Sequence, residues 1–148
     1  MDKGKVVSLL NRILEEELAG VVRYTHYSFM IFGYNRIPIV SWLREQAVES
    51  MGHAQRAGEM ITALGEHPSL TIGHLLETHK HDVGDILREA LDTERTAIDL
   101  YKQLLREAEG DSVWIEEYAR EMISAEEMHA HEVDKMLRKP GEVKSFSG

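Results

Sequence analysis

Several titratable side chains interrupt apolar stripes that repeat at helical spacing. Glu17 and Glu94 each stand within such a stripe, and His53 lies on another. Glu126 and His129, three residues apart, share one face of a later helix. A buried carboxylate without a partner loses several kcal/mol of solvation free energy. A cluster of divalent or trivalent metal ions compensates such groups directly, because carboxylates bridge metal ions and neutral imidazoles ligate them.

The same pattern occurs in both halves of the chain. Three pairs of residues recur at intervals of 76 or 77 positions: Glu17 and Glu94, Tyr24 and Tyr101, and His53 and His129. Such a repeat predicts an approximate two-fold axis, which places paired ligands opposite each other as in a two-metal site. Taken singly, each acidic residue is better interpreted as a solvated charge or as part of a polar core network; it is the combination that favours a metal site.

Four long amphipathic helices are needed to position these residues. We expect them at about residues 5–33, 37–64, 82–109 and 112–138. Short turns around Gly33 and Gly110 join them into two antiparallel hairpins. A crossover of about residues 65–81 is long enough to travel the length of a bundle. The predicted fold class is all-α, with residues 1–148 forming a single four-helix domain.

Composition excludes several classes of function. The 148 residues include 17 Lys+Arg, 26 Asp+Glu and no Cys, for a net charge of -9. The lack of Cys excludes disulfide scaffolds, zinc ribbons and cysteine-held iron–sulfur centres. The acidic charge argues against nucleic acid as a partner. No apolar run approaches the roughly 20 residues that cross a bilayer, and no signal-peptide pattern opens the chain. We therefore expect a soluble, cytoplasmic protein with no membrane partner.

The ligand spacing resembles that of the ferritin-like di-iron proteins, in which two helices each give a Glu and two each give Glu-x-x-His. Within that superfamily the chain is similar to the bacterioferritins from about Leu9 to Leu137. The motifs that carry the resemblance are Glu17-Leu18 followed by Tyr24, Glu49-Ser50-Met51-Gly52-His53-Ala54, and Glu126-Glu127-Met128-His129.

The resemblance implies a ferroxidase centre that holds two irons within one subunit. Its substrates would be Fe(II) and dioxygen or peroxide, and ferric mineral would be stored in a hollow homo-oligomer. By position, Glu17 and His53 would serve one iron. Glu94 and His129 would serve the other, with Glu126 as a bridge between the two.

The resemblance also implies roles for three further residues. Tyr24 and Tyr101 would form hydrogen bonds with ligands. Met51 occupies the position of the methionine that ligates haem b at a subunit interface in bacterioferritins. The alternative for Met51 is an ordinary core or interface methionine. Iron is thus the expected cofactor, and haem b is a candidate.

Two features depart from the family pattern. Ser50 stands where a second bridging Glu is expected. Three arrangements are compatible with this: an asymmetric centre, a centre that holds one iron tightly and one loosely, or a centre that recruits Glu49 from the same helix. Only seven residues follow Gly141, too few for the short fifth helix of many cage-forming ferritins. Three alternatives therefore stay open: a rubrerythrin-like peroxidase or oxidase without mineral storage, a DNA-protecting small ferritin, and a bundle with a degenerate metal site.

The crossover holds a second group of histidines. His74, His79 and His81 lie near Glu77 and Asp82 in the sequence. The group is interpreted either as a surface metal or iron-entry site or as solvated linker histidines. His26 and His131, on the predicted helices, are expected to be solvated.

Overall fold

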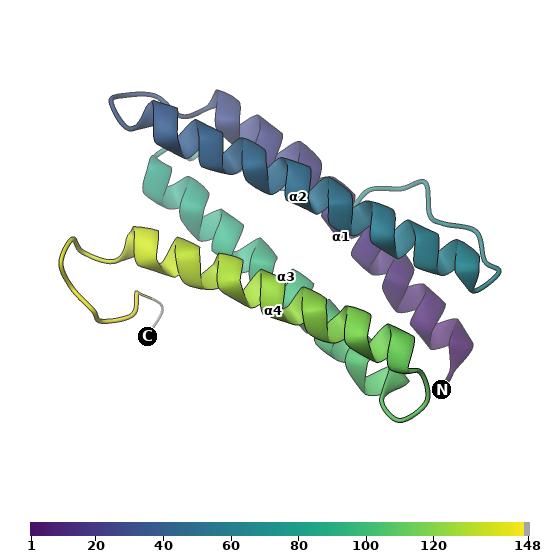
Figure 1. Ribbon diagram of the computed structural model, residues 1–148. Helices are drawn as coiled ribbons and strands as arrows, with labels where there is room; N and C mark the ends of the chain where they lie inside the picture. Colours follow the sequence, from purple (N-terminus) through teal and green to yellow (C-terminus); the bar gives the residue numbers. More distant parts are fainter. Residues whose placement is uncertain (147–148) are drawn as a thin grey trace. The chain divides into compact units, whose positions relative to one another are not determined.

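The protein consists of four helices joined by three connections. The computed structural model describes residues 1–146, and that part of the chain contains no strand. The helices are α1 (Lys3–Phe29), α2 (Arg36–Ala63), α3 (Val83–Ala108) and α4 (Val113–Leu137), labelled in Figure 1. They form two compact units, of which the first ends at His81 and the second begins at Asp82. None of the described helices has the length and apolar character needed to cross a membrane.

In the first unit α1 and α2 pack against each other as an antiparallel pair (Figure 1). The Asp2 side chain begins α1 by accepting a hydrogen bond of 3.1 Å from the Lys5 backbone N–H. Each helix contributes fully buried side chains that follow its apolar stripe. They are Val6, Leu10 and Ile13 on α1, and Leu43, Ala57 and Ile61 on α2. Apolar spacing of three and four residues therefore accounts for this hairpin.

The end of α1 differs from the prediction. The helix ends at Phe29 rather than at residue 33. Phe29 continues the helical spacing of Leu14 and Val21, which predicts a buried side chain, but it is 56% exposed. The reason lies in the next helix, where Arg36 Nη1 donates to the Ser28 and Ile31 carbonyls at 3.2 and 2.7 Å. Gly33, at φ +99°, then turns the chain into α2. The Arg36 side chain thus donates hydrogen bonds to carbonyls near the end of α1 that have no backbone N–H partner within that helix.

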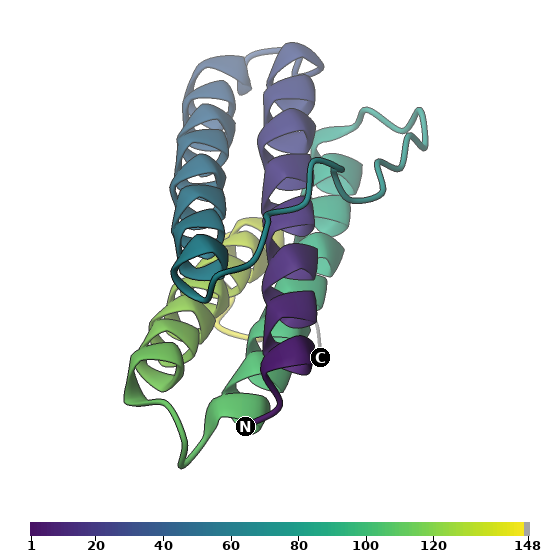
Figure 2. The same cartoon turned by 90° about the vertical axis from the view of Figure 1, so that its right-hand side faces the viewer.

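The crossover between α2 and α3 lies along α1 (Figure 2). The Ser69 N–H donates to Asn11 Oδ1 at 2.7 Å, and the Gly73 N–H donates to the Glu15 carbonyl at 2.8 Å. A Cβ at residue 73 would lie 3.1 Å from that carbonyl oxygen, so glycine permits the close approach. These contacts hold the crossover to α1 at two separate points.

In the second unit α3 and α4 form the other antiparallel pair (Figure 1). The Asp82 side chain caps α3 by accepting from the Gly84 N–H at 3.0 Å. Ser112 caps α4 by accepting from the Ile115 N–H at 3.4 Å, as the Gly110-Asp111-Ser112 sequence predicts. The helix boundaries of this unit lie close to those expected from the sequence.

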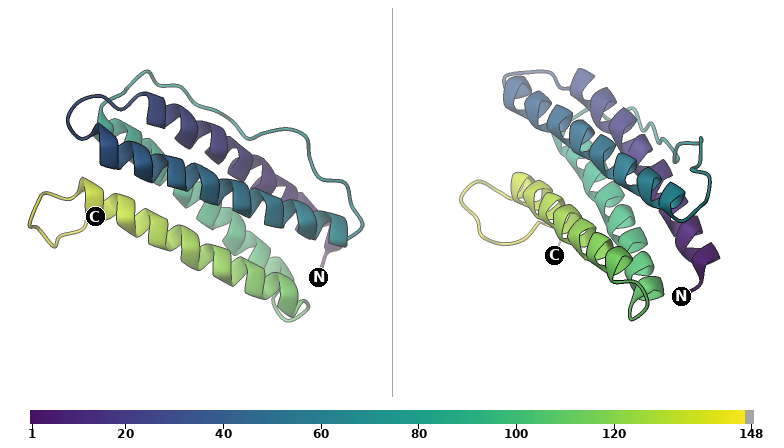
Figure 3. Two further views of the ribbon diagram at one scale, coloured as in Figure 1. Left: turned by 45° about the horizontal axis from the view of Figure 1, so that its top comes forward. Right: turned by 45° about the vertical axis from the view of Figure 1, so that its right-hand side comes forward.

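The chain beyond α4 folds back toward that helix (Figure 3). Asp134 is buried on α4 and accepts hydrogen bonds from Arg138 Nε at 2.8 Å and Ser145 Oγ at 3.0 Å. The Phe146 N–H donates to the same carboxylate at 3.3 Å. Asp134 is thus a buried acid with local partners, and it anchors the segment that follows the helix.

Candidate metal centre

The first unit brings Glu17 of α1 beside His53 of α2. Glu17 Oε1 lies 3.4 Å from His53 Nδ1, and the two residues are only 5% and 8% exposed. Each residue lies within the buried stripe of its helix, so pairing of the two stripes brings both side chains inside. The result is a carboxylate and an imidazole in contact away from water, which is a donor pair that suits a transition-metal ion.

Ser50 is buried one helical turn before His53. A Cβ at Gly20 would lie 3.0 Å from Ser50 Oγ, so the missing side chain on α1 leaves room for Ser50 of α2. Glu49, the adjacent residue, is half-exposed, and its Oε1 lies 4.0 Å from His53 Nε2. The structure therefore places a second carboxylate within reach of His53, but from the solvent side of α2.

The second unit gathers three potential ligands. Glu94 of α3 and Glu126 and His129 of α4 each offer one ligand atom, and these atoms lie within 4.8 Å of one another. Glu126 Oε2 lies 3.6 Å from His129 Nδ1, as expected for residues three apart on one helical face. Glu94 and Glu126 are 6% and 3% exposed. Two carboxylates are thus concentrated in a space that excludes most water.

The chemistry of these donors fits iron. Carboxylate oxygens and imidazole nitrogens are the ligands of carboxylate-bridged and non-haem Fe(II) sites, and no thiolate is needed. Two nearby buried carboxylates repel each other and lose solvation, and a bound cation would compensate both costs.

The two tyrosines of the repeated pattern are both buried in aromatic surroundings. The Tyr24 ring meets the Tyr27 and Trp42 rings edge to face, at centroid distances of 6.2 and 6.4 Å. Tyr101 meets Tyr118 in the same manner at 5.9 Å. Edge-to-face packing fixes the position of each ring beside its ligand helix. Hydrogen bonding of Tyr24 and Tyr101 to metal ligands stays a prediction.

Met51 lies on the surface of α2, where it is 38% exposed. It borders a shallow surface hollow lined by Val21, Thr25, Arg44, Ala47, Val48, Met51, Gly52 and Gln55. The interpretation of Met51 as a core methionine is therefore wrong. Its position on the surface is compatible with an interface residue or a ligand.

The histidine group of the crossover is only partly as expected. His79 and His81 lie with Glu77, whereas Asp82 caps α3. His26, expected to be solvated, has its Nε2 3.0 Å from Glu77 Oε2. The sequence gives no signal for this contact, because the two residues are 51 positions apart and neither belongs to a periodic pattern.

A family model, Ferritin, described as a ferritin-like domain, matches residues 7–141. Comparison with curated proteins gives no match. Among solved structures, the chain is similar to a ferritin-like, diiron-carboxylate protein from Bacillus anthracis str. Ames, with 23% identity and a TM-score of 0.88. That alignment covers 93% of this chain and 99% of the other.

Two further solved structures are similar. The bacterioferritin of Rhodobacter capsulatus has 23% identity and a TM-score of 0.82, with 90% of this chain and 84% of that chain covered. The dodecameric thioferritin from Bacteroides fragilis, a bacterioferritin-related protein, has 22% identity and a TM-score of 0.83, with 93% and 86% covered.

These likenesses confirm the predicted ferritin-like fold, and residues 1–146 form four helices and no strand. The family model extends over nearly the whole chain, including every helix that carries a predicted ligand. The chain belongs to the ferritin-like domain family.

Proposed function

We propose that this protein oxidises Fe(II) at a di-iron centre of bacterioferritin type and serves iron storage and detoxification. The observation that carries the proposal is the group of Glu94, Glu126 and His129, which concentrates two buried carboxylates and an imidazole within 4.8 Å. Membership of the ferritin-like family supports it. So does the likeness to the bacterioferritin of Desulfovibrio desulfuricans, whose diiron site is described in different catalytic states.

In this proposal Glu17 and His53 would hold one iron. Glu94 and His129 would hold the other, and Glu126 would serve as the bridging carboxylate. The pairing of Glu17 with His53 at 3.4 Å in one unit supports the first assignment, and the ligand group of the other unit supports the second.

The net reaction is a transfer of electrons from the metal substrate to an oxidant. Two Fe(II) each give up one electron, and dioxygen accepts both with two protons to become hydrogen peroxide. When peroxide is the oxidant, it accepts two electrons and two protons and becomes two molecules of water. The anionic carboxylates would stabilise the higher charge of the ferric product, and the imidazoles would ligate iron as neutral donors.

Aerobic addition of Fe(II) tests the proposal. The wild-type chain is expected to oxidise Fe(II) faster than buffer, and Glu94→Ala and Glu126→Ala are expected to remove that gain. The matched control is Glu127→Ala on the same helix, because Glu127 is half-exposed and its Oε1 pairs with Lys102 Nζ at 3.6 Å, outside the group of buried ligands. Oxidation at the wild-type rate in the Glu94 and Glu126 variants would contradict the proposal.

Assembly and haem binding are part of the same proposal. The bacterioferritin of Rhodobacter capsulatus contains haem iron, and the thioferritin of Bacteroides fragilis is dodecameric. We propose a cytoplasmic homo-oligomer, in which the exposed Met51 ligates haem b at an interface. A Soret band that is lost in Met51→Leu and kept in Met128→Leu tests the haem assignment; its retention in Met51→Leu would exclude that ligand.

A further inference from the structure

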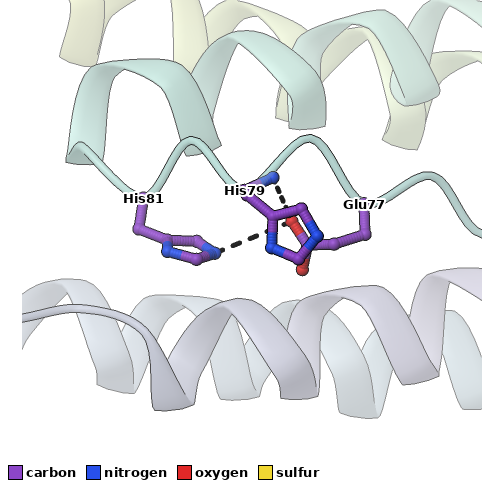
Figure 4. A group of neighbouring side chains, drawn as sticks. All are labelled: Glu77, His79 and His81. Atoms are coloured by element: carbon purple, nitrogen blue, oxygen red, sulfur yellow. Dashed lines mark hydrogen bonds and ion pairs between the residues drawn. The ribbon is translucent and has the colours of Figure 1, made fainter.

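A second group of potential metal ligands lies on the crossover of the first unit. Glu77, His79 and His81 each offer one ligand atom, and these atoms lie within 4.8 Å of one another. Figure 4 shows the His81 ring nitrogen directed at the Glu77 carboxylate, and the His79 backbone nitrogen joined to the same carboxylate. His81 Nε2 lies 3.6 Å from Glu77 Oε1, and the two histidine ring centroids are 6.3 Å apart. None of these residues belongs to the proposed di-iron centre.

The backbone that carries this group is held to α1. Arg23 Nη2 donates to the His74 carbonyl at 3.3 Å, and His26 Nε2 lies 3.0 Å from Glu77 Oε2. The Gly73 N–H adds its bond to the Glu15 carbonyl immediately before this segment. The group therefore lies on a tethered backbone, and less conformational entropy is lost on binding an ion.

The Glu77 carboxylate is oriented by two partners. His79 has φ +57°, a left-handed conformation that is uncommon outside glycine, and its N–H donates to Glu77 Oε1. This backbone hydrogen bond, followed by the His26 contact, holds the pKa of Glu77 below its usual value. These contacts fix the orientation of the carboxylate. Oε2 lies 3.0 Å from His26 Nε2, whereas Oε1 accepts from the His79 N–H and lies 3.6 Å from His81 Nε2.

The His81 ring supplies an independent observation. Its Nε2 is shielded from solvent and makes no hydrogen bond within the described residues. A shielded, unsatisfied ring nitrogen is unfavourable unless something binds it. It is directed at the nearest carboxylate oxygen, which is the arrangement expected of a ligand pair that shares a cation.

We propose that Glu77, His79 and His81 bind one divalent transition-metal ion on the crossover. Two imidazoles and one carboxylate form a donor set that binds zinc, cobalt and Fe(II) and leaves positions open for water. Tetrahedral ligands at about 2.1 Å from an ion lie about 3.4 Å from one another, so the ligand atoms need to move by about an ångström. His26 acts as a positioning residue, because it holds the carboxylate oxygen that faces away from the histidines.

Zinc binding to the full chain tests the proposal, with Co²⁺ absorption as a second readout of imidazole ligation. The variants are His79→Gly and His81→Ala, each expected to weaken binding of one Zn²⁺ per chain by at least about tenfold. Glycine suits the left-handed backbone at residue 79, so that variant removes the ligand without backbone strain. The matched control is His74→Ala, which keeps the carbonyl bound by Arg23 and is expected to bind zinc as the wild type does.

The zinc affinities of the variants decide whether the crossover binds the ion. Weaker zinc binding in His79→Gly, with wild-type zinc binding in His74→Ala, supports the site. A smaller loss of zinc affinity in His26→Ala supports the positioning role of His26. Wild-type zinc affinity in both His79→Gly and His81→Ala would overturn the proposal, as would equal loss in His74→Ala. If His81→Ala alters the circular dichroism of the chain, His79→Gly decides. Because the ligands differ, the result is independent of Fe(II) oxidation, which is measured separately with the Glu94 and Glu126 variants.

Discussion

At the scale of single residues, the two units carry unequal sets of ligands. Glu126 gives the second unit a carboxylate beside its histidine, whereas the first unit has Ser50 at the matching position, packed against Gly20. Glu49 partly offsets the difference, since its Oε1 is 4.0 Å from His53 Nε2. An exposed carboxylate is a weaker substitute, because water competes for it and screens its charge.

This inequality predicts that Ser50→Glu increases the rate of Fe(II) oxidation, because the substitution supplies the missing bridging carboxylate. Ser50→Gln is the control, since it adds similar volume beside Gly20 without a charge. Stopped-flow absorbance after aerobic Fe(II) addition gives the rates. An unchanged or lower rate in Ser50→Glu, at a Tm similar to that of Ser50→Gln, would show that serine is already compatible with full function.

At the scale of helices and connections, periodicity accounts for most of the fold. Apolar residues three and four apart predicted all four helices. The Gly110-Asp111-Ser112 sequence offers cap candidates for α4, and the structure shows that Ser112 is the cap, since its side chain accepts from the Ile115 N–H. The end of α1 was not predictable in the same way. It depends on the Arg36 side chain, which reaches back from α2 to the Ser28 and Ile31 carbonyls.

Buried polar groups could likewise be predicted where periodicity marks them, and not where their burial depends on contacts between distant residues. Glu17, Glu94 and Glu126 were identifiable because each interrupts an apolar stripe. Asp134 was missed, since its burial depends on Ser145 and Phe146 in a segment without periodicity. Contacts between distant, irregular segments leave no local pattern in a sequence.

The contact between α1 and α2 at Gly20 gives a prediction for stability. Alanine within a helix is favoured over glycine by about 1 kcal/mol, but here the new Cβ would lie 3.0 Å from Ser50 Oγ. In the wild-type background, Gly20→Ala is therefore expected to give little of this stabilisation, because the new Cβ crowds Ser50. In the Ser50→Gly background the crowding is absent, and Gly20→Ala is expected to stabilise the protein. Denaturant unfolding of the four proteins in this double-mutant cycle should give a coupling free energy of about 0.5 kcal/mol or more. Additive effects would show that the helices separate easily at this point.

At the scale of the whole molecule, charge and exposed apolar residues bear on assembly. Under the proposed function, the net charge of -9 would attract Fe(II) and raise its local concentration. On α2, Ile37 and Val48 are largely exposed, and Met51 lies on the same helix. Exposed apolar residues gathered on one element are typical of an interface between protein chains.

A homo-oligomer built through this helix predicts a large mass for the wild type and a smaller one for Val48→Asp. A buried, unpaired carboxylate at an interface is unfavourable, whereas the same residue on a free surface is harmless. Light scattering at matched concentrations measures the mass, and Val113→Asp on α4, another largely exposed valine, is the control. Equal masses for the wild type and Val48→Asp would place the interface elsewhere or show a monomer.

The proposed function requires the buried carboxylates and imidazoles to hold iron. Anomalous diffraction at the iron edge, from crystals soaked anaerobically with Fe(II), measures this without any intermediate step. We expect an anomalous peak bounded by Glu94, Glu126 and His129, and a second peak beside Glu17 and His53. Iron-free density at both sets of ligands in fully soaked crystals would contradict it.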